Sequence, residues 1–323
     1  MSDADQHDGT AEQKAQEAAD FDAQTKERIA NGFVPDLRRL EPVDWFYNNV
    51  WRDPEIALLH WQPRIEKIVE VAQQAGGQVL ELGCGCGMLS LELARAGLQV
   101  TGVDLSPLSI EVANKYRDSN PFLDGFGQLD YICGDFDELD LPDGSFDTVV
   151  FFRSLHHFPN TAEVMEKVSR LLKPQGNLLI SEPIRSHFNQ ESARLAALLR
   201  LVLPTWVPYD EKISGPWTEK RITENIVNIY EEYAYEGEHH QSEMDNSTDS
   251  AEDIRDAVSQ YLEIVEEDLS DAFTDKILGG LRGEHRYELA CFLKAFDAYV
   301  VKNDILPPTS IELHAKKPGG RFE

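Results

Sequence analysis

The chain has 323 residues, 41% of them hydrophobic and 27% charged, which are the proportions of a globular protein and not of a fibrous or fully disordered one. Thirty Lys and Arg stand against 58 Asp and Glu, so the formal net charge is −28 at pH 7. A surface this negative repels nucleic-acid phosphates and anionic lipid headgroups, and we therefore expect no nucleic-acid partner and no membrane insertion.

Cysteine usage and hydropathy indicate a reducing, aqueous compartment. Four scattered cysteines are too few for a disulfide framework in a chain of this length. Cys84 and Cys86 form a C-x-C pair without a second pair downstream, so no metal site is expected. The longest apolar run, residues 195–208, has fourteen residues, short of the roughly 20 that span a bilayer. The first residues are acidic, whereas a secretory signal begins with basic ones. We expect a cytoplasmic location.

The first 75 residues divide into two predicted segments. Residues 1–27 contain eight acidic and two basic side chains and almost no large apolar ones, a composition typical of a mobile acidic tail. Residues 28–75 are rich in aromatic side chains, and their apolar residues recur at helical spacing. These features predict an N-terminal helical arm that ends at the glycine pair Gly76-Gly77.

Residues 76–183 alternate short aliphatic runs with helical stretches, the pattern of repeated strand–helix units. The strands read as continuous apolar runs, such as VLEL and TVVFF, because both faces of a parallel sheet are covered. The fold class that this pattern predicts is α/β, with a doubly wound, mostly parallel, Rossmann-like sheet. The five predicted strands are residues 78–82, 99–104, 129–133, 148–152 and 177–182.

Residues 184–305 are predicted to form a mainly helical cap, because this segment leaves the fifth strand at the edge of the sheet where such folds bind ligands. Helices are expected near residues 192–203, over 254–273 with an acidic outer face, and around 289–300. Residues 206–217 contain three aromatic side chains that could lie against an organic ring.

The charge and the C-terminal segment complete this outline. Residues 231–275 hold sixteen acids and one base, and so carry −15 of the net charge of −28. Facing outward they would form a solubilising surface, and facing inward they would favour a cationic amine as ligand. Residues 306–323 are expected to close the fold, with an antiparallel edge strand over 309–315.

The strongest local signal is the sequence Glu81-Leu-Gly-Cys-Gly-Cys-Gly87, between the first predicted strand and a predicted helix over residues 88–96. A tight turn there needs residues without a Cβ, so that a ligand can lie against the backbone. The nicotinamide-dinucleotide pattern G-x-G-x-x-G would need its third glycine at position 88, which is Met88. The spacing therefore disfavours a dehydrogenase.

Two acidic residues follow the next strands. Asp104 ends the second predicted strand, where its carboxylate can accept hydrogen bonds from both hydroxyls of a ribose. Asp135 ends the third, next to Phe136, in position for an exocyclic amine and a flat ring face. A Walker-type lysine and a basic cluster for a polyphosphate are missing from the sequence. The predicted ligand is a nucleoside without a phosphate chain.

Taken with these residues, two longer stretches resemble the class I S-adenosylmethionine-dependent methyltransferases. They are LPDGSFDTVVFFRSLHHF, from Leu141 to Phe158, and RLLKPQGNLLISEP, from Arg170 to Pro183. Both are similar to the small-molecule branch that includes the ubiquinone and menaquinone C-methyltransferases. The resemblance covers residues 76–184.

The resemblance implies an enzyme with S-adenosyl-L-methionine as cofactor and a small organic molecule as methyl acceptor, by O- or C-methylation, with N-methylation also open. Two residues depart from the family pattern: Gln175 stands where a second glycine is usual, and Arg153 where a small residue is common. The residues implied or positioned for the cofactor are Glu81, Gly83, Cys84, Gly85, Gly87, Asp104, Leu105, Asp135, Phe136 and Phe152.

His156 and His157 are the candidate catalytic residues, because they follow the fourth strand at the ligand edge. An unperturbed histidine has a suitable pKa to take a proton from the acceptor. Both could instead have a purely structural role. Two other functions stay open: a non-catalytic protein that binds the cofactor, and the disfavoured dehydrogenase. The oligomeric state is not determined by the sequence.

Overall fold

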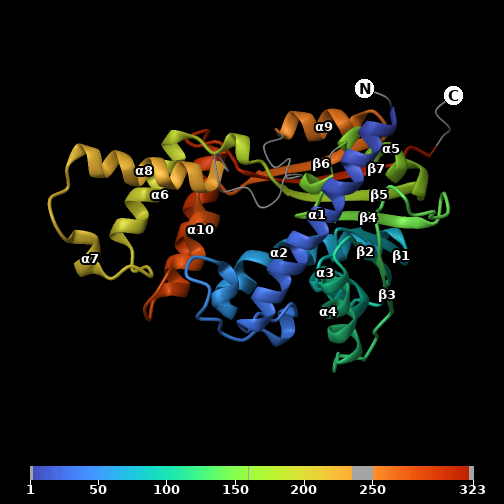
Figure 1. Ribbon diagram of the computed structural model, residues 1–323, viewed down its shortest axis with the longest axis horizontal. Coiled ribbons are helices and arrows are strands. Elements are labelled where there is room, and N and C mark those ends of the chain that lie inside the picture. Colours follow the sequence, from blue (N-terminus) through green and yellow to red (C-terminus); the bar gives the residue numbers. More distant parts are fainter. Residues whose placement is uncertain (1–2, 159, 235–249, 320–323) are drawn as a thin grey trace.

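The computed structural model describes residues 3–158, 160–234 and 250–319, and for residues 3–10 the backbone alone (Figure 1). Its described residues form a seven-stranded sheet of order β3-β2-β1-β4-β5-β7-β6. β1 to β5 run parallel, and β7 is antiparallel to both of its neighbours. The predicted doubly wound, mostly parallel α/β sheet is therefore confirmed. The strands are β1 (Gln78–Leu82), β2 (Gln99–Asp104), β3 (Gln128–Cys133), β4 (Phe146–Phe152), β5 (Leu172–Pro183), β6 (Glu263–Ser270) and β7 (Ser310–Lys316).

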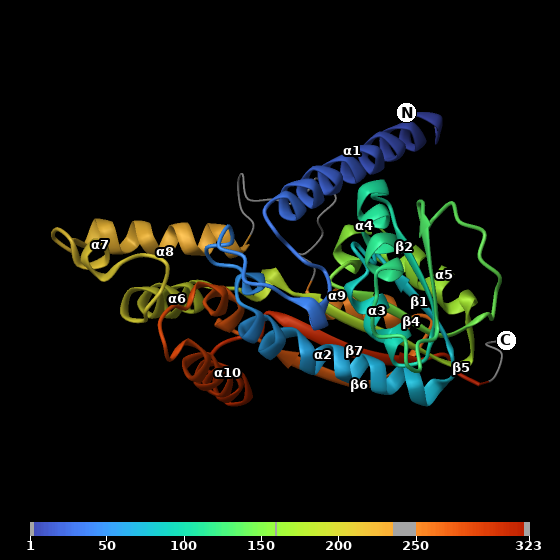
Figure 2. The ribbon, with the colours of Figure 1, turned by 90° about the horizontal axis from the view of Figure 1, so that it is seen from below.

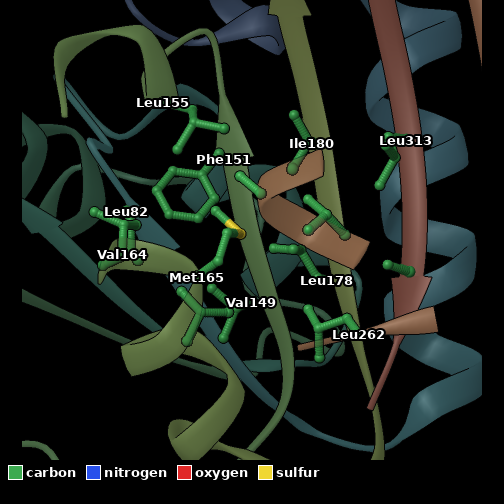
Figure 3. Packing of buried hydrophobic residues seen from close by; sticks show 14 of the residues in the cluster. Leu82, Val149, Phe151, Leu155, Val164, Met165, Leu178, Ile180, Leu262 and Leu313 are labelled. Atoms are coloured by element: carbon green, nitrogen blue, oxygen red, sulfur yellow. The ribbon is translucent and has the colours of Figure 1, made fainter. Parts of the chain in front are cut away.

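Helices cover both faces of the sheet, which explains the continuous apolar runs in its strands. Along β4, Val149 and Phe151 pack against α5 (Thr161–Leu171) and α9 (Ala251–Ser259), as Figure 3 shows in part. The alternate residues, Val150 and Phe152, belong to the cluster on the opposite face. That face is covered by α2 (Pro54–Ala75) and α3 (Met88–Arg95), while α4 (Pro107–Asp118) follows β2.

The N-terminal segment differs from the predicted mobile tail, because the structure forms a helix there, α1 (Asp3–Ala30). Figure 2 shows α1 lying across the end of the sheet where α4 begins. The Asp22 carboxylate accepts hydrogen bonds from the Ser106 hydroxyl (2.6 Å) and the Leu108 backbone N–H (3.0 Å). Ala, Gln, Glu and Lys are strong helix formers, so this acidic composition is also that of a helix with one packed face.

The segment 184–305 is helical in large part, with one correction. Of the helix predicted over residues 254–273, only the start is helical, in α9, and residues 263–270 form the edge strand β6. The apolar spacing there fits both structures, and the free edge of β7 supplies backbone partners that only a strand can use. β7 therefore lies inside the sheet instead of at its edge.

Helices α6 (Gln190–Val202), α8 (Glu219–Ala234) and α10 (Arg286–Lys302) of this segment contribute to a second apolar cluster, separate from the sheet core. The short helix α7 (Tyr209–Ile213) lies between α6 and α8 in the chain. Phe188 and Phe273 are fully buried in this cluster, together with Ile56 of α2. In Figures 1 and 2 these helices lie at the end of the molecule away from α3 and α4. Residues 235–249, which hold part of the acidic run, lie outside the described residues.

Candidate active site

A cavity of about 400 Å³ opens at the carboxyl ends of the parallel strands, beneath α1. Ligand pockets in proteins commonly measure roughly 300 to 1,000 Å³, so a nucleoside-sized molecule fits this space. Every residue predicted for the cofactor or for catalysis lines the cavity, except Gly87. The predicted residues that line it are Glu81, Gly83, Cys84, Gly85, Asp104, Leu105, Asp135, Phe136, Phe152, His156 and His157.

The three glycines of the loop after β1 meet different structural requirements. A Cβ on Gly83 would lie 2.4 Å from the Cβ of Ser154, so the loop and β4 pack too closely for a side chain. Gly85 has φ of +50° and no heavy atom within 4 Å of its Cβ position, which leaves open space where a ligand can approach the backbone. Gly87 faces Tyr131, whose Oη would be 2.1 Å from a Cβ. Gly87 thus allows close packing at the start of α3 and does not line the cavity, and its role in cofactor binding stays a prediction.

Glu81 is a buried carboxyl without a cationic partner among the described residues. Its Oε2 accepts a hydrogen bond from the Ser90 hydroxyl. Burial raises the pKa of Glu81 to about 8, and the nearby Asp104 adds to this, whereas Ser90 acts in the opposite direction. A cationic group brought into the cavity beside Glu81 would restore its ionised form.

Asp104 and Asp135 are held at the strand ends by backbone amides. Asp104 accepts the Gly85 N–H at 2.7 Å on Oδ2 and the Ser106 N–H at 2.9 Å on Oδ1. An ionised carboxylate has about four acceptor positions, so both oxygens can still accept a hydroxyl. Burial raises the pKa of Asp104, against the effect of these amides. Asp135 is paired through Oδ2 with the Lys14 ammonium of α1 at 2.6 Å.

His156 forms a buried dyad with Glu182, the residue before the end of β5. His156 Nδ1 lies 2.6 Å from Glu182 Oε2, while Oε1 accepts the backbone N–H groups of Ser154 and Leu155, each at 2.7 Å. Burial lowers the pKa of His156, although Glu182 acts to raise it. Burial acts to raise the pKa of Glu182, but His156 and the backbone amides bring it below its ordinary value. An ionised Glu182 thus accepts the Nδ1 proton and leaves Nε2 of neutral His156 as a proton acceptor.

His157 is engaged by α1 instead. Its Nδ1 lies 2.8 Å from Oε1 of Glu17, a buried residue of that helix, and its ring packs edge-on against Phe21 at 4.9 Å. The adjacent His156 ring is 4.1 Å away. The two predicted histidines therefore share the cavity, but one faces the sheet core and the other ties α1 to the cavity wall.

The cavity is covered by α1 and the N-terminal arm, which corrects the predicted cap. Among the described residues of the segment 184–305, Arg185 alone lines the cavity. The predicted aromatic surface lies elsewhere: Trp206 packs against Tyr47, with ring centroids 5.5 Å apart. The order of elements along the chain predicted that this segment lies near the ligand edge of the sheet. In the structure, α6, α8 and α10 bury their apolar faces in the second apolar cluster instead.

Several cavity residues were missed by the sequence reasoning. On α1 the lining residues recur every three or four positions, which is the spacing of one helical face, and this signal was present in the sequence. The arm contributes Trp51 and Trp61, which stack at 5.9 Å, and Trp61 meets Phe152 edge-on at 5.5 Å. The missed residues of α1 are Lys14, Glu17, Phe21, Gln24, Thr25 and Arg28.

Two further searches concern the described residues only. No group of three or more His, Cys, Asp or Glu in the described ranges could hold a metal ion. No helix in that part of the chain is long and apolar enough to cross a bilayer. All four cysteines have free thiols.

Comparison with known proteins decides the nature of the core. Residues 80–180 match the family model described as "Methyltransferase domain". The chain carries a methyltransferase domain. This match confirms the resemblance found in the sequence, and S-adenosylmethionine is the methyl donor for domains of this class.

Curated relatives of the methyltransferase domain come from both fungi and bacteria. The chain is 36% identical over 122 residues to the mitochondrial ubiquinone biosynthesis O-methyltransferase of Schizosaccharomyces pombe, over 36% of this chain and 43% of that protein. It is 37% identical over 119 residues to the ubiquinone biosynthesis O-methyltransferase of Xanthomonas euvesicatoria, over 36% of this chain and 48% of the relative. The chain thus matches less than half of the length of these relatives.

Among solved structures, a putative sarcosine dimethylglycine methyltransferase from Galdieria sulphuraria is similar to this chain with a TM-score of 0.49 and 15% sequence identity. The comparison covers 83% of this chain and 89% of that one. The fold assignment above rests on the strand order and directions of the sheet itself.

Proposed function

We propose that this protein is an S-adenosylmethionine-dependent methyltransferase that transfers a methyl group to a small organic acceptor. The observation that carries the proposal is one cavity in which the glycine loop, Asp104 and Asp135 lie together with the His156–Glu182 dyad. The match of residues 80–180 to a methyltransferase domain supports the same activity.

The residues at the cofactor end fit this group. The open backbone at Gly85 is a cradle that a Cβ would fill. Glu81 is a buried carboxyl suited to an ammonium group, Asp104 to ribose hydroxyls, and Asp135 to an exocyclic amine. When bound, S-adenosylmethionine supplies a methyl group on a sulfonium centre, which is ready for displacement.

His156 has the features of the general base. Glu182 fixes its tautomer, so Nε2 can take the proton of an acceptor hydroxyl or acidic carbon as the methyl is transferred. α1 and the two tryptophans of the arm exclude water from the acceptor. A phenolic hydroxyl is the acceptor group that this arrangement favours, and the O-methyltransferase names of the curated relatives support O-methylation over C- or N-methylation.

The two alternative functions receive less support. The family model that matches residues 80–180 describes a methyltransferase domain, and the spacing of the glycine loop disfavours a dehydrogenase. A protein that only binds the cofactor would have no use for a neutral histidine held by its own buried carboxylate. Exclusion of nucleic acids as acceptors remains an expectation from the net charge of −28.

The test is calorimetric and chemical. Titration with S-adenosylhomocysteine should show one site per chain, and incubation with S-adenosylmethionine labelled in the methyl group, together with a panel of catechols and phenols, should yield S-adenosylhomocysteine and a labelled product. Absence of binding would refute the proposal, whereas binding without turnover on any acceptor in a metabolite extract would favour the non-catalytic alternative.

A further inference from the structure

One positively charged side chain of the cavity has no hydrogen-bond or ion-pair partner among the described residues. Arg153 directly follows β4 and lines the cavity together with His156 and Arg185. Its guanidinium carbon lies over the Trp61 ring, 5.8 Å from the centroid. Across residues 11–158, 160–234 and 250–319, no hydrogen bond or ion pair forms to this guanidinium. A half-buried charge without a partner in the described chain is available to pair with an anionic group of a ligand.

The acidic groups around Arg153 form no hydrogen bond or ion pair with it. Both oxygens of Glu182 are used by His156 and by two backbone N–H groups. Asp275, the other carboxylate whose charge acts on Arg153, is paired through Oδ2 with Lys276, and its Oδ1 has no hydrogen-bond partner among the described residues. Burial lowers the pKa of Arg153, although the charge of Glu182 acts to raise it. A lowered pKa is the direction expected for a cation without a close partner.

The backbone of Arg153 is also unusual. Its φ is +59°, in the left-handed region that long side chains rarely adopt. The conformation is held from outside, because the Arg153 N–H donates to the carbonyl oxygen of Ser181 at 2.8 Å. Residues kept in such conformations cluster at ligand sites, where the surrounding structure maintains the strain.

Several other ionisable side chains that line the cavity are paired with one another. Glu17 is with His157, and Asp135 and Asp137 are with Lys14. The Arg153 guanidinium has no such pairing in the part of the chain that the structure describes, and a positive charge beside the acceptor is the opposite of what a cationic amine acceptor would require. Trp51, Trp61 and Phe152 form an apolar wall next to it.

We propose that Arg153 binds a carboxylate group of the acceptor, so that the acceptor is a small aromatic acid whose methylated atom is a separate group. This inference rests on the proposed function, because it concerns the acceptor end of the same site. The planar guanidinium matches a carboxylate with two parallel N–H···O bonds, and the tryptophan and phenylalanine rings suit a flat apolar body.

The binding test uses simple probes and needs no turnover. Calorimetry on the protein saturated with S-adenosylhomocysteine measures benzoate, its neutral analogue benzamide, and phenylphosphate. We expect benzoate to bind at least about 10-fold more tightly than benzamide, because only benzoate makes a charge-assisted pair. Equal affinity for benzoate and benzamide would overturn the inference, as would absence of benzoate binding at 10 mM. Tighter binding of phenylphosphate than of benzoate would overturn the carboxylate as the group recognised.

Matched variants assign the effect to Arg153. Arg153→Asn removes the charge but tolerates a positive φ, and should weaken benzoate by roughly 10- to 100-fold while leaving benzamide unchanged. Arg153→Lys keeps the charge without the planar guanidinium. Its affinity for benzoate should lie between those of the original protein and of Arg153→Asn. Arg194→Gln, on the exposed surface of α6, changes the net charge by the same amount as Arg153→Asn and should leave the affinity for benzoate unchanged. Benzoate binding that Arg153→Asn leaves unchanged would refute the role of Arg153.

The controls separate this inference from the proposed function. All variants should bind S-adenosylhomocysteine within about twofold of the original protein, since Arg153 is not among the residues proposed to hold the cofactor. If the original protein does not bind S-adenosylhomocysteine, the proposed function fails, and the benzoate titrations are then done on the cofactor-free protein. In the cofactor-free protein, weaker benzoate binding in Arg153→Asn would still support an anion site at Arg153, and unchanged benzoate binding would refute it.

Discussion

Glu81 couples cofactor binding to a proton, and the substitution Glu81→Gln tests this. In the cofactor-free protein, burial holds the pKa of Glu81 at about 8, so the carboxyl is largely protonated at pH 6 to 7. An ammonium group of the cofactor beside it favours the ionised form, so binding releases a proton. The affinity should therefore rise with pH by up to about tenfold per unit, until the pH approaches 8.

Calorimetry with S-adenosylhomocysteine at pH 5.5 to 7 measures this slope, below the range of roughly 7.7 to 8.0 where α-amino groups ordinarily titrate. Buffers of different ionisation enthalpy report the released proton directly, and the count should approach one. Glu81→Gln cannot ionise and should bind with an affinity independent of pH. A flat profile in the original protein, or an equal slope in Glu81→Gln, would refute the reasoning.

The same carboxyl also affects stability, with a sign that follows from its pKa. Glu81 has an ordinary value of 4.5 when unfolded and about 8 when folded. Between these values the folded state binds more protons, so the cofactor-free protein should lose stability as the pH rises through this window. At about 1.4 kcal/mol per pH unit the loss has an upper bound of about 5 kcal/mol, reached above pH 8. Urea unfolding at pH 6 and 9 should show the part of this loss that falls between pH 6 and 8, at most about 3 kcal/mol, in the original protein and its absence in Glu81→Gln.

Three further predictions concern other residues of the cavity. Asp104→Asn should lower cofactor affinity by about 1.5 to 3 kcal/mol, measured by calorimetry, and an unchanged affinity would remove Asp104 from the site. His156→Ala should reduce the rate of methyl transfer by about 100-fold with cofactor binding intact. Glu182→Gln should also slow methyl transfer and shift its pH profile. Full activity of both variants from pH 5 to 9 would show that the dyad has only a structural role. Lys14→Met should speed the release of S-adenosylhomocysteine in stopped-flow experiments, because it removes the ion pair between α1 and Asp135; an unchanged rate would show that this pair does not hold the helix closed.

The residues predicted for the cofactor could be grouped from the sequence, because they lie in or just after three neighbouring strands of one sheet. Glu81 and Asp104 lie near the ends of β1 and β2, and Asp135 follows β3, so the strand–loop pattern was sufficient to bring them to one cavity; their binding of the cofactor stays a prediction. The acceptor end could not be read in this way. The role proposed for Glu182 depends on its contact with His156, 26 residues earlier. The role proposed for Arg153 depends on its positive φ and on the absence of a partner among the described residues, which only the folded chain reveals.

The acidic N-terminal segment shows how composition and burial can point in different directions. Its net charge predicts a solvated tail, yet α1 places Glu17 and Thr25 in buried positions over the cavity. A few contacts are enough, because each side chain finds a polar partner at the cavity: Glu17 finds His157, and Thr25 lies 3.0 Å from the Ser109 hydroxyl. Mean hydropathy describes the segment as a whole, whereas packing depends on a single helical face.

The position of α1 links the two ends of the cavity. Lys14 contacts the acid at the end of β3, and Glu17 contacts the histidine next to the candidate base. The same helix therefore shields from water the residues proposed to hold the cofactor and those proposed to take the proton. Burial is what raises the pKa of Glu81 and lowers that of His156. Because an electrostatic interaction is stronger where water is excluded, the covering helix contributes to both binding and catalysis without supplying a reacting group.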